Sequence, residues 1–249
     1  MTRPVSDRLL AALDPQPGQT ILELASGTGE TGFAAARAVG PEGRVISTDF
    51  APGMVDAARR ESERLGLDNV EHRVMDAERL DLDDDGVDGV LCRWGFMLMA
   101  DPGAALAETR RVLRAGGRLA LSVWGPPERN LWASIPRRAL MEQTGAPPPN
   151  PDEPGIFALA DPERLRSLLT GAGFAEPRLE EVELTYDFGD FDGYWRFIIE
   201  LAGGTAVALR AMPDEEREAV RERVARATSG LRSEDGLSLR GVALNAVTE

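Results

Sequence analysis

Residues 20–29 read TILELASGTG, a short apolar run that ends in a turn containing two glycines. Helix-forming apolar residues follow over 33–39, so this stretch predicts a strand, a glycine-rich loop and a helix. From Gly27 the loop also satisfies G-x-G-x-x-G, and Asp49 follows Gly29 by 20 residues, the spacing of an acid that binds a ribose. Taken alone, the loop and the aspartate predict a dinucleotide site.

Two acidic residues argue against a pyrophosphate at this loop. Glu30 begins the predicted helix, and Glu23 lies four residues before Gly27. A helix N-terminus that binds phosphate relies on free backbone N–H groups with no negative charge beside them. The same carboxylates suit a cation. S-adenosylmethionine carries an ammonium and a sulfonium group and no phosphate, so the charge pattern favours it over NAD.

Strands and helices alternate along most of the chain, which indicates an α/β fold. Beyond the first strand, we expect strands at residues 44–49, 70–75, 89–92, 118–124, about 178–188 and 237–247. Such alternation predicts a mostly parallel sheet with helices on both faces. The length of 249 residues suits a single domain with insertions.

The predicted helices have marked ends. One begins at about Pro52, after the second strand. Another has Asp101 at its N-cap, Pro102 at its first position and Gly116-Gly117 at its predicted end. The Asp-Pro pair at 161–162 opens a further helix in the same way.

Two segments interrupt the alternation. Residues 126–160 are rich in proline and predict a long loop, which in a compact domain is usually functional or disordered. Residues 189–236 are mostly helical in pattern, with an amphipathic helix at 215–227. We interpret both segments as substrate-side caps on one domain, 1–249, whose residues 1–125 form the cofactor-binding half.

Within residues 18–124 the chain resembles the class I S-adenosylmethionine-dependent methyltransferases. Four stretches carry the resemblance, in order and at the family's spacing: 23–29 (ELASGTG), 49–54 (DFAPGM), 75–78 (MDAE) and 112–119 (VLRAGGRL). Each stretch is weak evidence alone, but together they are specific. The similarity is greatest to the ubiquinone and menaquinone type of methyltransferases and their small-molecule relatives.

The resemblance implies a fold and a set of cofactor residues. The fold is a Rossmann-like, doubly wound sheet of seven strands in the order 3-2-1-4-5-7-6, with the last strand antiparallel. In this family the acid of the second motif binds the ribose hydroxyls, apolar residues pack on adenine, and the acid of the third motif receives the adenine amino group. The residues implied for S-adenosylmethionine are Glu23, Ala25, Ser26, Gly27, Thr28, Gly29, Asp49, Phe50, Met54, Asp76, Ala77, Arg93 and Trp94. Relatives often carry an N-terminal helix that closes over the cofactor, whereas only about twenty residues precede the first strand here.

The acceptor side is less well defined. Residues 93–97 (RWGFM) follow the fourth strand, where relatives contact both the methionine part and the acceptor, so Met97 is a candidate there. The other candidates are Trp124, Trp132, Tyr194 and Trp195, although core packing explains any one tryptophan equally well. As a group, the tryptophans indicate a pocket for a small, partly apolar acceptor. The sequence does not select oxygen, carbon or nitrogen as the accepting atom. Tyr194 or an acidic cap residue could serve as a base, but the sequence selects no catalytic residue.

Composition restricts the partners. A formal net charge of -14 opposes binding to nucleic acid and to anionic membranes. One cysteine allows no internal disulfide, and no apolar run is long enough for a signal peptide or a spanning helix. We therefore expect a cytoplasmic monomer or homodimer that binds a small molecule.

Three other features have ordinary explanations. Residues 81–86 (DLDDDG) open like a calcium loop, but the twelfth position is Cys92 instead of glutamate, so a solvated acidic turn is favoured. His72 alternates with valines along a strand, and Cys92 lies in a core strand, which favours structural roles for both. We predict no metal site.

Two alternative functions remain open. An NAD-dependent oxidoreductase would use the G-x-G-x-x-G loop with Asp49, although Glu23 and the lack of a convincing Tyr-x-x-x-Lys or catalytic histidine oppose it. A cofactor-binding partner protein that has lost turnover is the second alternative.

Overall fold

The computed structural model describes residues 2–148, 150, 152–201, 203–233 and 236–249. They form two compact units. The first, called here the sheet unit, comprises Thr2–Trp124, Pro151–Val182 and Ala243–Glu249. The second, called the helical unit, comprises Gly125–Asn150 and Glu183–Val242. The division into one cofactor-binding half and two substrate-side caps stays a prediction.

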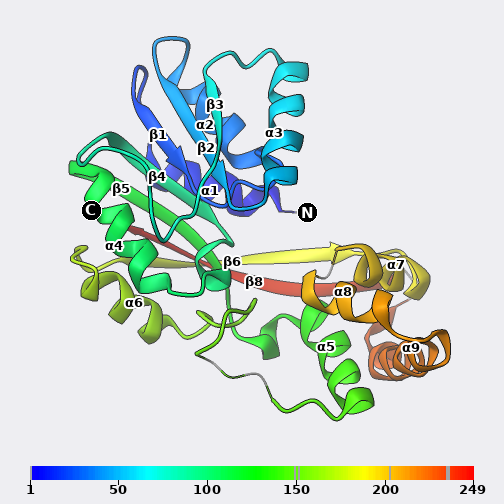
Figure 1. Ribbon diagram of the computed structural model, residues 1–249. Helices are drawn as coiled ribbons and strands as arrows, with labels where there is room; N and C mark the ends of the chain where they lie inside the picture. The colour runs from blue at the N-terminus through cyan, green and yellow to red at the C-terminus, as the bar shows by residue number, and fades with distance from the viewer. Residues whose placement is uncertain (1, 149, 151, 202, 234–235) are drawn as a thin grey trace. The chain divides into compact units, whose positions relative to one another are not determined.

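The strands form one sheet whose order agrees with the prediction. They are β1 (Thr20–Glu23), β2 (Arg44–Asp49), β3 (Val70–Val74), β4 (Val87–Arg93), β5 (Leu113–Trp124), β6 (Arg178–Asp187), β7 (Arg232–Ser233) and β8 (Gly236–Thr248). Their order is β3-β2-β1-β4-β5-β8-β6, and the short β7 pairs with β8 (Figure 1). The β3 to β5 part is parallel, and β8 runs antiparallel to β5. The predicted order is confirmed, with β8 as the last strand of the predicted seven.

The helices of the sheet unit flank the sheet on both faces. They are α1 (Arg3–Leu13), α2 (Glu30–Val39), α3 (Pro52–Leu65), α4 (Pro102–Val112) and α6 (Pro162–Gly171). The helical unit contains α5 (Leu131–Thr144), α7 (Phe191–Leu201), α8 (Gly203–Ala211) and α9 (Asp214–Thr228). Helix α1 packs against α2, and both α2 and α3 reach His72 of β3, so these three share a face. Helix α4 packs against β5 and α6 and lies in front of the sheet in Figure 1.

The capping aspartates behave as predicted, but one predicted helix end is wrong. The side chains of Asp101 and Asp161 accept backbone hydrogen bonds at 2.9 and 3.0 Å. Helix α4 ends at Val112, and the Gly116-Gly117 pair lies inside β5. A side chain at Gly117 would approach the Asp88 carbonyl oxygen to 2.8 Å. The glycines therefore let β5 pass close to β4, where the strand register shifts, and do not stop a helix.

Helix α1 precedes the first strand and belongs to the core of the sheet unit. Its side chains Val5, Leu9 and Leu13 are buried, and the helix packs against β4 and β5. Burial of each such side chain contributes about 1.5–3 kcal/mol. The roughly twenty residues before β1 thus supply an ordered helix beside the strand ends.

The helical unit contains a helix where the sequence predicts a loop. Residues 126–160 include α5, which continues through Pro136, so the loop prediction is wrong for Leu131–Thr144. The reason is long-range burial: Trp132 and Ile135 point into the unit's interior. There Trp132 meets Tyr186 and Phe197 at ring distances of 5.2 and 5.9 Å. The helical pattern predicted for 189–236 is confirmed by α7, α8 and α9.

In the part of the chain that the structure describes, no helix combines the length and the apolar character needed to cross a membrane.

Asn130 connects the ends of the helical unit's segments. Its Nδ2 donates to the carbonyl oxygens of Gly125 and Val242, both at 3.0 Å. Its Oδ1 accepts from the Val242 N–H at 3.0 Å and from the Trp132 indole at 3.1 Å. The Asn130 side chain is fully buried, so water cannot take its place as a hydrogen-bond partner for these groups.

We expect Asn130→Ala to lower the free energy of unfolding by about 3 kcal/mol, because several buried polar groups lose their partner at once. Urea unfolding followed by tryptophan fluorescence measures this. Ser238→Ala, at an exposed position of β8, is the control and should shift the midpoint little. Equal midpoints for the two variants would contradict the role assigned to Asn130.

Candidate functional site

Two strained turns mark the carboxyl ends of the central strands β1 and β4. Ala25 has φ 50° and Trp94 has φ 61°, values in the left-handed region that residues with side chains rarely adopt. Between the two turns lies Gly95, where an added Cβ would come within 2.6 Å of both the Ala25 Cβ and the Cys92 Sγ. Backbone strain of this kind persists where packing over-determines it, and it collects at functional sites.

Asp49 at the end of β2 holds the glycine loop. Its Oδ2 accepts from the Gly27 N–H at 2.8 Å, and its Oδ1 accepts from the Ala51 N–H at 2.9 Å. Gly27 and Gly29 have φ 56° and 89°, which glycine adopts without strain. Gly29 also lies on the Phe33 ring, since an added Cβ would approach that ring to 2.4 Å. The Asp49 carboxylate and the Phe33 ring therefore both contact the loop backbone.

Glu23 is buried, and its carboxylate is directed into the protein. Its Oε1 accepts from the Gly32 N–H at 2.6 Å, and its Oε2 accepts from the Ser47 hydroxyl at 3.1 Å. Burial raises the pKa of Glu23 to about 7, although Gly32, Ser47 and the Arg93 charge all lower it. Both oxygens thus contact protein donors, and any attraction for a cation at the loop acts through space.

Arg93 joins the end of β4 to the first two helices. One guanidinium nitrogen donates to the Ser6 hydroxyl of α1 and to the Glu30 carboxylate of α2, both at 2.7 Å. The guanidinium also lies 5.0 Å from the centre of the Trp94 ring. Trp94 in turn stacks on Trp124, with ring centres 4.3 Å apart. The structure therefore brings together residues predicted for different ligands. Arg93 and Trp94 were predicted for the cofactor, and Trp124 for the acceptor.

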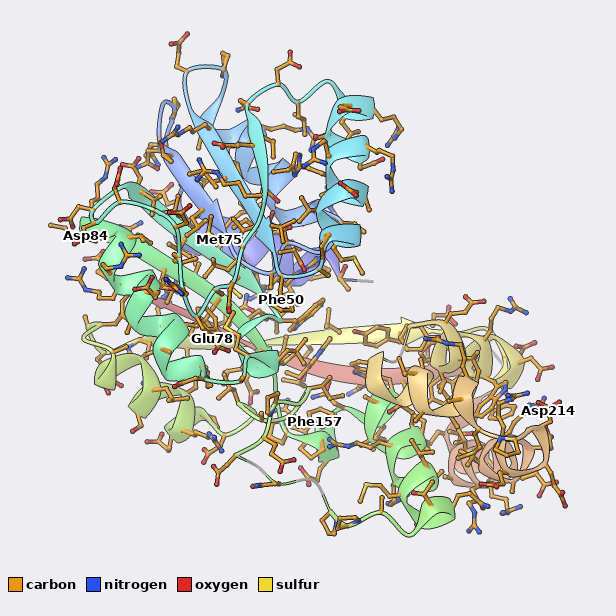
Figure 2. The ribbon with its side chains drawn as sticks, in the orientation of Figure 1. Phe50, Met75, Glu78, Asp84, Phe157 and Asp214 are labelled. Atoms are coloured by element: carbon orange, nitrogen blue, oxygen red, sulfur yellow. The ribbon has the colours of Figure 1, made fainter. Side chains whose placement is uncertain are left out.

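Large apolar side chains are exposed around these turns. Phe50 is 76% exposed and Met54 45%, and Val74 and Leu98 are each 55% exposed. Phe50 follows β2, Met54 lies in α3, and Val74 ends β3. Leu98 lies in the short helix η1 (Phe96–Leu98). Figure 2 shows Phe50 just after β2, with Met75 and Glu78 on the chain that leaves β3. Exposed apolar side chains gathered at strand ends indicate a ligand surface.

The remaining predicted cofactor residues border this surface. Asp76 is exposed and accepts from the Glu78 N–H at 2.9 Å, and Ala77 beside it is half-buried. Thr28 is exposed at the tip of the glycine loop. Ser26 has a buried hydroxyl oxygen that contacts no donor or acceptor among the described residues.

The predicted acceptor residues separate into two groups. Met97 is buried in the sheet unit, and its carbonyl oxygen accepts from the Gly155 N–H at 2.9 Å. Trp132 and Tyr194 belong to the aromatic interior of the helical unit, and Trp195 is half-buried on α7. The Tyr194 hydroxyl donates to the Trp132 carbonyl oxygen at 2.8 Å, and burial raises its pKa well above the usual value. Tyr194 is therefore a poor candidate for a base.

Residues 155–160 lie in the segment predicted as a substrate-side cap, but their contact with η1 was not predicted. They belong to the sheet unit, and the Gly155 bond to Met97 places them beside η1. Ile156 and Phe157 of this segment are half-buried, and Figure 2 labels Phe157. The proline-rich sequence gave no signal for this contact, because it joins residues far apart in the chain.

The three features with ordinary explanations have structural partners. Arg111 donates to Asp84 at 2.7 Å and to the Leu82 carbonyl oxygen at 2.8 Å, which ties down the acidic turn. His72 lies 2.8 Å from the Ser62 hydroxyl, and burial lowers its pKa. Burial raises the pKa of Cys92 to about 12, so its thiol is a poor nucleophile near neutral pH.

Gly32 leaves no room for a side chain, because an added Cβ would lie 2.1 Å from the Glu23 Oε2. We expect Gly32→Ala to lower the free energy of unfolding by about 2–4 kcal/mol, through overpacking and the loss of a hydrogen bond to a buried acid. Gly53→Ala is the matched control, since an added Cβ there meets no atom within 4 Å. Urea unfolding of both variants tests this, and a Gly32→Ala protein as stable as Gly53→Ala would disprove the steric argument.

Comparison with known proteins assigns a family to this arrangement. Residues 15–140 match the family model described as "Methyltransferase domain". Nocamycin O-methyltransferase of Saccharothrix syringae is 34% identical over 193 residues, which cover 73% of this chain and 69% of that protein. The demethylmenaquinone methyltransferase of Thermus thermophilus is 35% identical over 176 residues, which cover 66% of this chain and 77% of that protein.

Other relatives are longer than this chain. The match to an uncharacterised 37.1 kDa protein in a transposon of Streptomyces fradiae is 42% identical over 127 residues but spans only 34% of that protein. Among solved structures, a putative methyltransferase from Bacillus halodurans superposes with a TM-score of 0.66, at 20% identity, over 98% of this chain and 97% of that one. This structural likeness supports the fold. The family model and the two relatives that match over most of their length show that the chain belongs to the S-adenosylmethionine-dependent methyltransferase domain family.

Proposed function

We propose that this protein transfers a methyl group from S-adenosylmethionine to a small, partly apolar molecule, at an oxygen, carbon or nitrogen atom. The observation that carries the proposal is the glycine loop held by Asp49 directly beside the exposed side chains of Phe50 and Met54. A carboxylate next to a flat apolar surface suits a ribose with its attached adenine.

The residues at the loop fit the cofactor. Each Asp49 oxygen accepts one backbone N–H and keeps a lone pair for a ribose hydroxyl. Phe50 and Met54 would cover adenine, and Asp76 with Ala77 would face its amino group. At Gly27 an added Cβ would meet no atom within 4 Å, so the loop has open space for the methionine part.

The amino-acid part of the cofactor would lie between the two strained turns. The proposed contacts there are Ala25, Ser26, Gly27, Thr28 and Gly29 of the loop, with Arg93 and Trp94 of the second turn. The buried Ser26 hydroxyl has no hydrogen-bond partner among the described residues, and this supports the placement, since a buried polar atom without a partner is costly. Glu23 would attract the cationic cofactor through space, from its buried position at the end of β1.

Bound S-adenosylmethionine supplies an electrophilic methyl group on sulfonium, and transfer is an in-line displacement. The chain's own task is to hold donor and acceptor in line and to exclude water. The stack of half-buried Trp94 on buried Trp124 and the buried Phe96 and Met97 side chains of η1 provide an apolar boundary for that purpose. We assign no side chain to proton transfer.

Two side chains support an apolar acceptor. Leu98 is exposed in η1, after the turn that ends β4, and Phe157 is half-buried. Proteins similar to this one are named nocamycin O-methyltransferase, aklanonic acid methyltransferase and demethylmenaquinone methyltransferase. We extend only the class of acceptor to this chain, a small and partly apolar molecule. A cytoplasmic location, a monomeric or dimeric state and the absence of nucleic-acid and membrane partners belong to the same proposal.

Calorimetric titration of S-adenosylhomocysteine and of NAD tests the donor. We expect binding of S-adenosylhomocysteine only, and binding of NAD alone would overturn the proposal in favour of an oxidoreductase. A screen of small aromatic and quinone acceptors with labelled donor then tests transfer. Donor binding without transfer to any acceptor would favour a non-catalytic partner protein.

Asp49→Asn should weaken S-adenosylhomocysteine binding roughly 10- to 100-fold, because hydrogen bonds to a charged group contribute about 1.5–3 kcal/mol. Asp56→Asn is the matched control: Asp56 is exposed on α3 and pairs with Arg59 at 2.7 Å. Calorimetry measures both, with circular dichroism to verify folding. Equal affinities for the two variants would remove Asp49 from the site.

A further inference from the structure

Glu23 is a buried acid without a cation of its own. The side chain is 3% exposed, and its two hydrogen-bond donors, Gly32 N–H and Ser47 hydroxyl, are both neutral. None of the described residues forms an ion pair with it. Arg93 is the nearby cation, but its guanidinium is paired with Glu30 at 2.7 Å. Buried charges in proteins are normally paired, so an unpaired carboxylate here calls for a partner.

Charges at the edge of the sheet act on Glu23 from both sides. Arg93, at the end of β4, lowers its pKa, and Asp49, at the end of β2, raises it. Cys92 is the other titratable group facing it, and the Glu23 charge raises the pKa of that thiol. Strand β1 lies between β2 and β4, so the loop that follows Glu23 lies between those two charges. A cation held on this loop would act as Arg93 does.

We propose that the sulfonium of the methyl donor is the missing counter-ion of Glu23, which makes Glu23 the residue that favours the donor over the product, whose sulfur carries no charge. The inference rests on the proposed function. Donor and product share the adenosine and amino-acid groups, so their contacts with Asp49 and Phe50 are the same. They differ at sulfur, which is a cationic sulfonium in the donor and a neutral thioether in the product.

The proton balance follows directly. When the donor binds, protonated Glu23 releases its proton to solvent, and the buried carboxylate attracts the sulfonium charge through space. When transfer leaves the thioether, Glu23 takes a proton back from solvent. The preference for donor is therefore fully present above the pKa of about 7 in the free protein and is lost as the pH falls below it.

The test compares affinities for S-adenosylmethionine, without acceptor, and S-adenosylhomocysteine by calorimetry between pH 6 and pH 8.5. We expect the ratio of the product Kd to the donor Kd to rise about three- to tenfold over this range, because one unit of pKa shift corresponds to about tenfold in affinity. In Glu23→Gln the ratio should stay flat. Titrations in buffers of different ionisation enthalpy should show more proton release with the donor than with the product.

Two further variants keep the result interpretable. Glu42→Gln removes the same charge at an exposed position before β2, and its ratio should rise with pH as in the unmodified protein. Ser47→Ala keeps the Glu23 carboxylate but removes a donor that lowers its pKa, so the rise should move to higher pH. This variant serves if Glu23→Gln does not fold.

A ratio that is independent of pH in the unmodified protein, or that rises equally in Glu23→Gln, would overturn the inference while leaving the proposed function intact. Failure of both ligands to bind would overturn the proposed function and the inference with it.

Discussion

The two hydrogen bonds of the Glu23 carboxylate determine where the glycine loop lies. Because Glu23 ends β1, Gly32 lies in α2 and Ser47 lies in β2, this one side chain joins the three elements that surround the loop. The Thr48 hydroxyl adds a bond to the Glu23 carbonyl oxygen at 2.8 Å. An exposed acid could not do this, since water would compete for its oxygens. The geometry of the glycine loop therefore depends on the buried Glu23 carboxylate. Removing this charged group from water costs free energy.

Much of the sheet could be predicted from local sequence, because its determinants are local. The Asp101 and Asp161 caps, the strand periods and the glycine loop each involve residues a few positions apart. The order of the strands came from the family resemblance. What local patterns could not predict were choices settled by distant contacts: Gly116-Gly117 lies in β5 because β4 passes close to it, and α5 forms because its side chains meet β6 and α7.

The same distinction explains the candidate site. The motif spacing specifies the positions of Asp49 at the end of β2, Phe50 just after it and Met54 in α3. The structure brings the aspartate and the loop together. The aromatic residues were harder to place, because a tryptophan or tyrosine serves equally well in a core or a pocket. Only three-dimensional packing shows that Tyr194 is buried with its hydroxyl bonded, whereas Trp94 and Trp124 stack beside Arg93.

Burying Glu23 couples stability to ligand charge. A carboxyl group whose pKa is raised from 4.5 to about 7 binds more protons in the folded than in the unfolded protein, so stability falls as pH rises through that interval. The loss approaches about 3 kcal/mol above neutral pH, a large part of the stability of an ordinary domain. An apolar residue would remove this cost, but the Gly32 N–H of α2 would lose its acceptor and the site would lose its fixed negative charge. A cation bound at the loop offsets part of the same cost, and a neutral molecule of the same shape does not. The destabilising feature of the free protein is thus the one that can distinguish sulfonium from thioether.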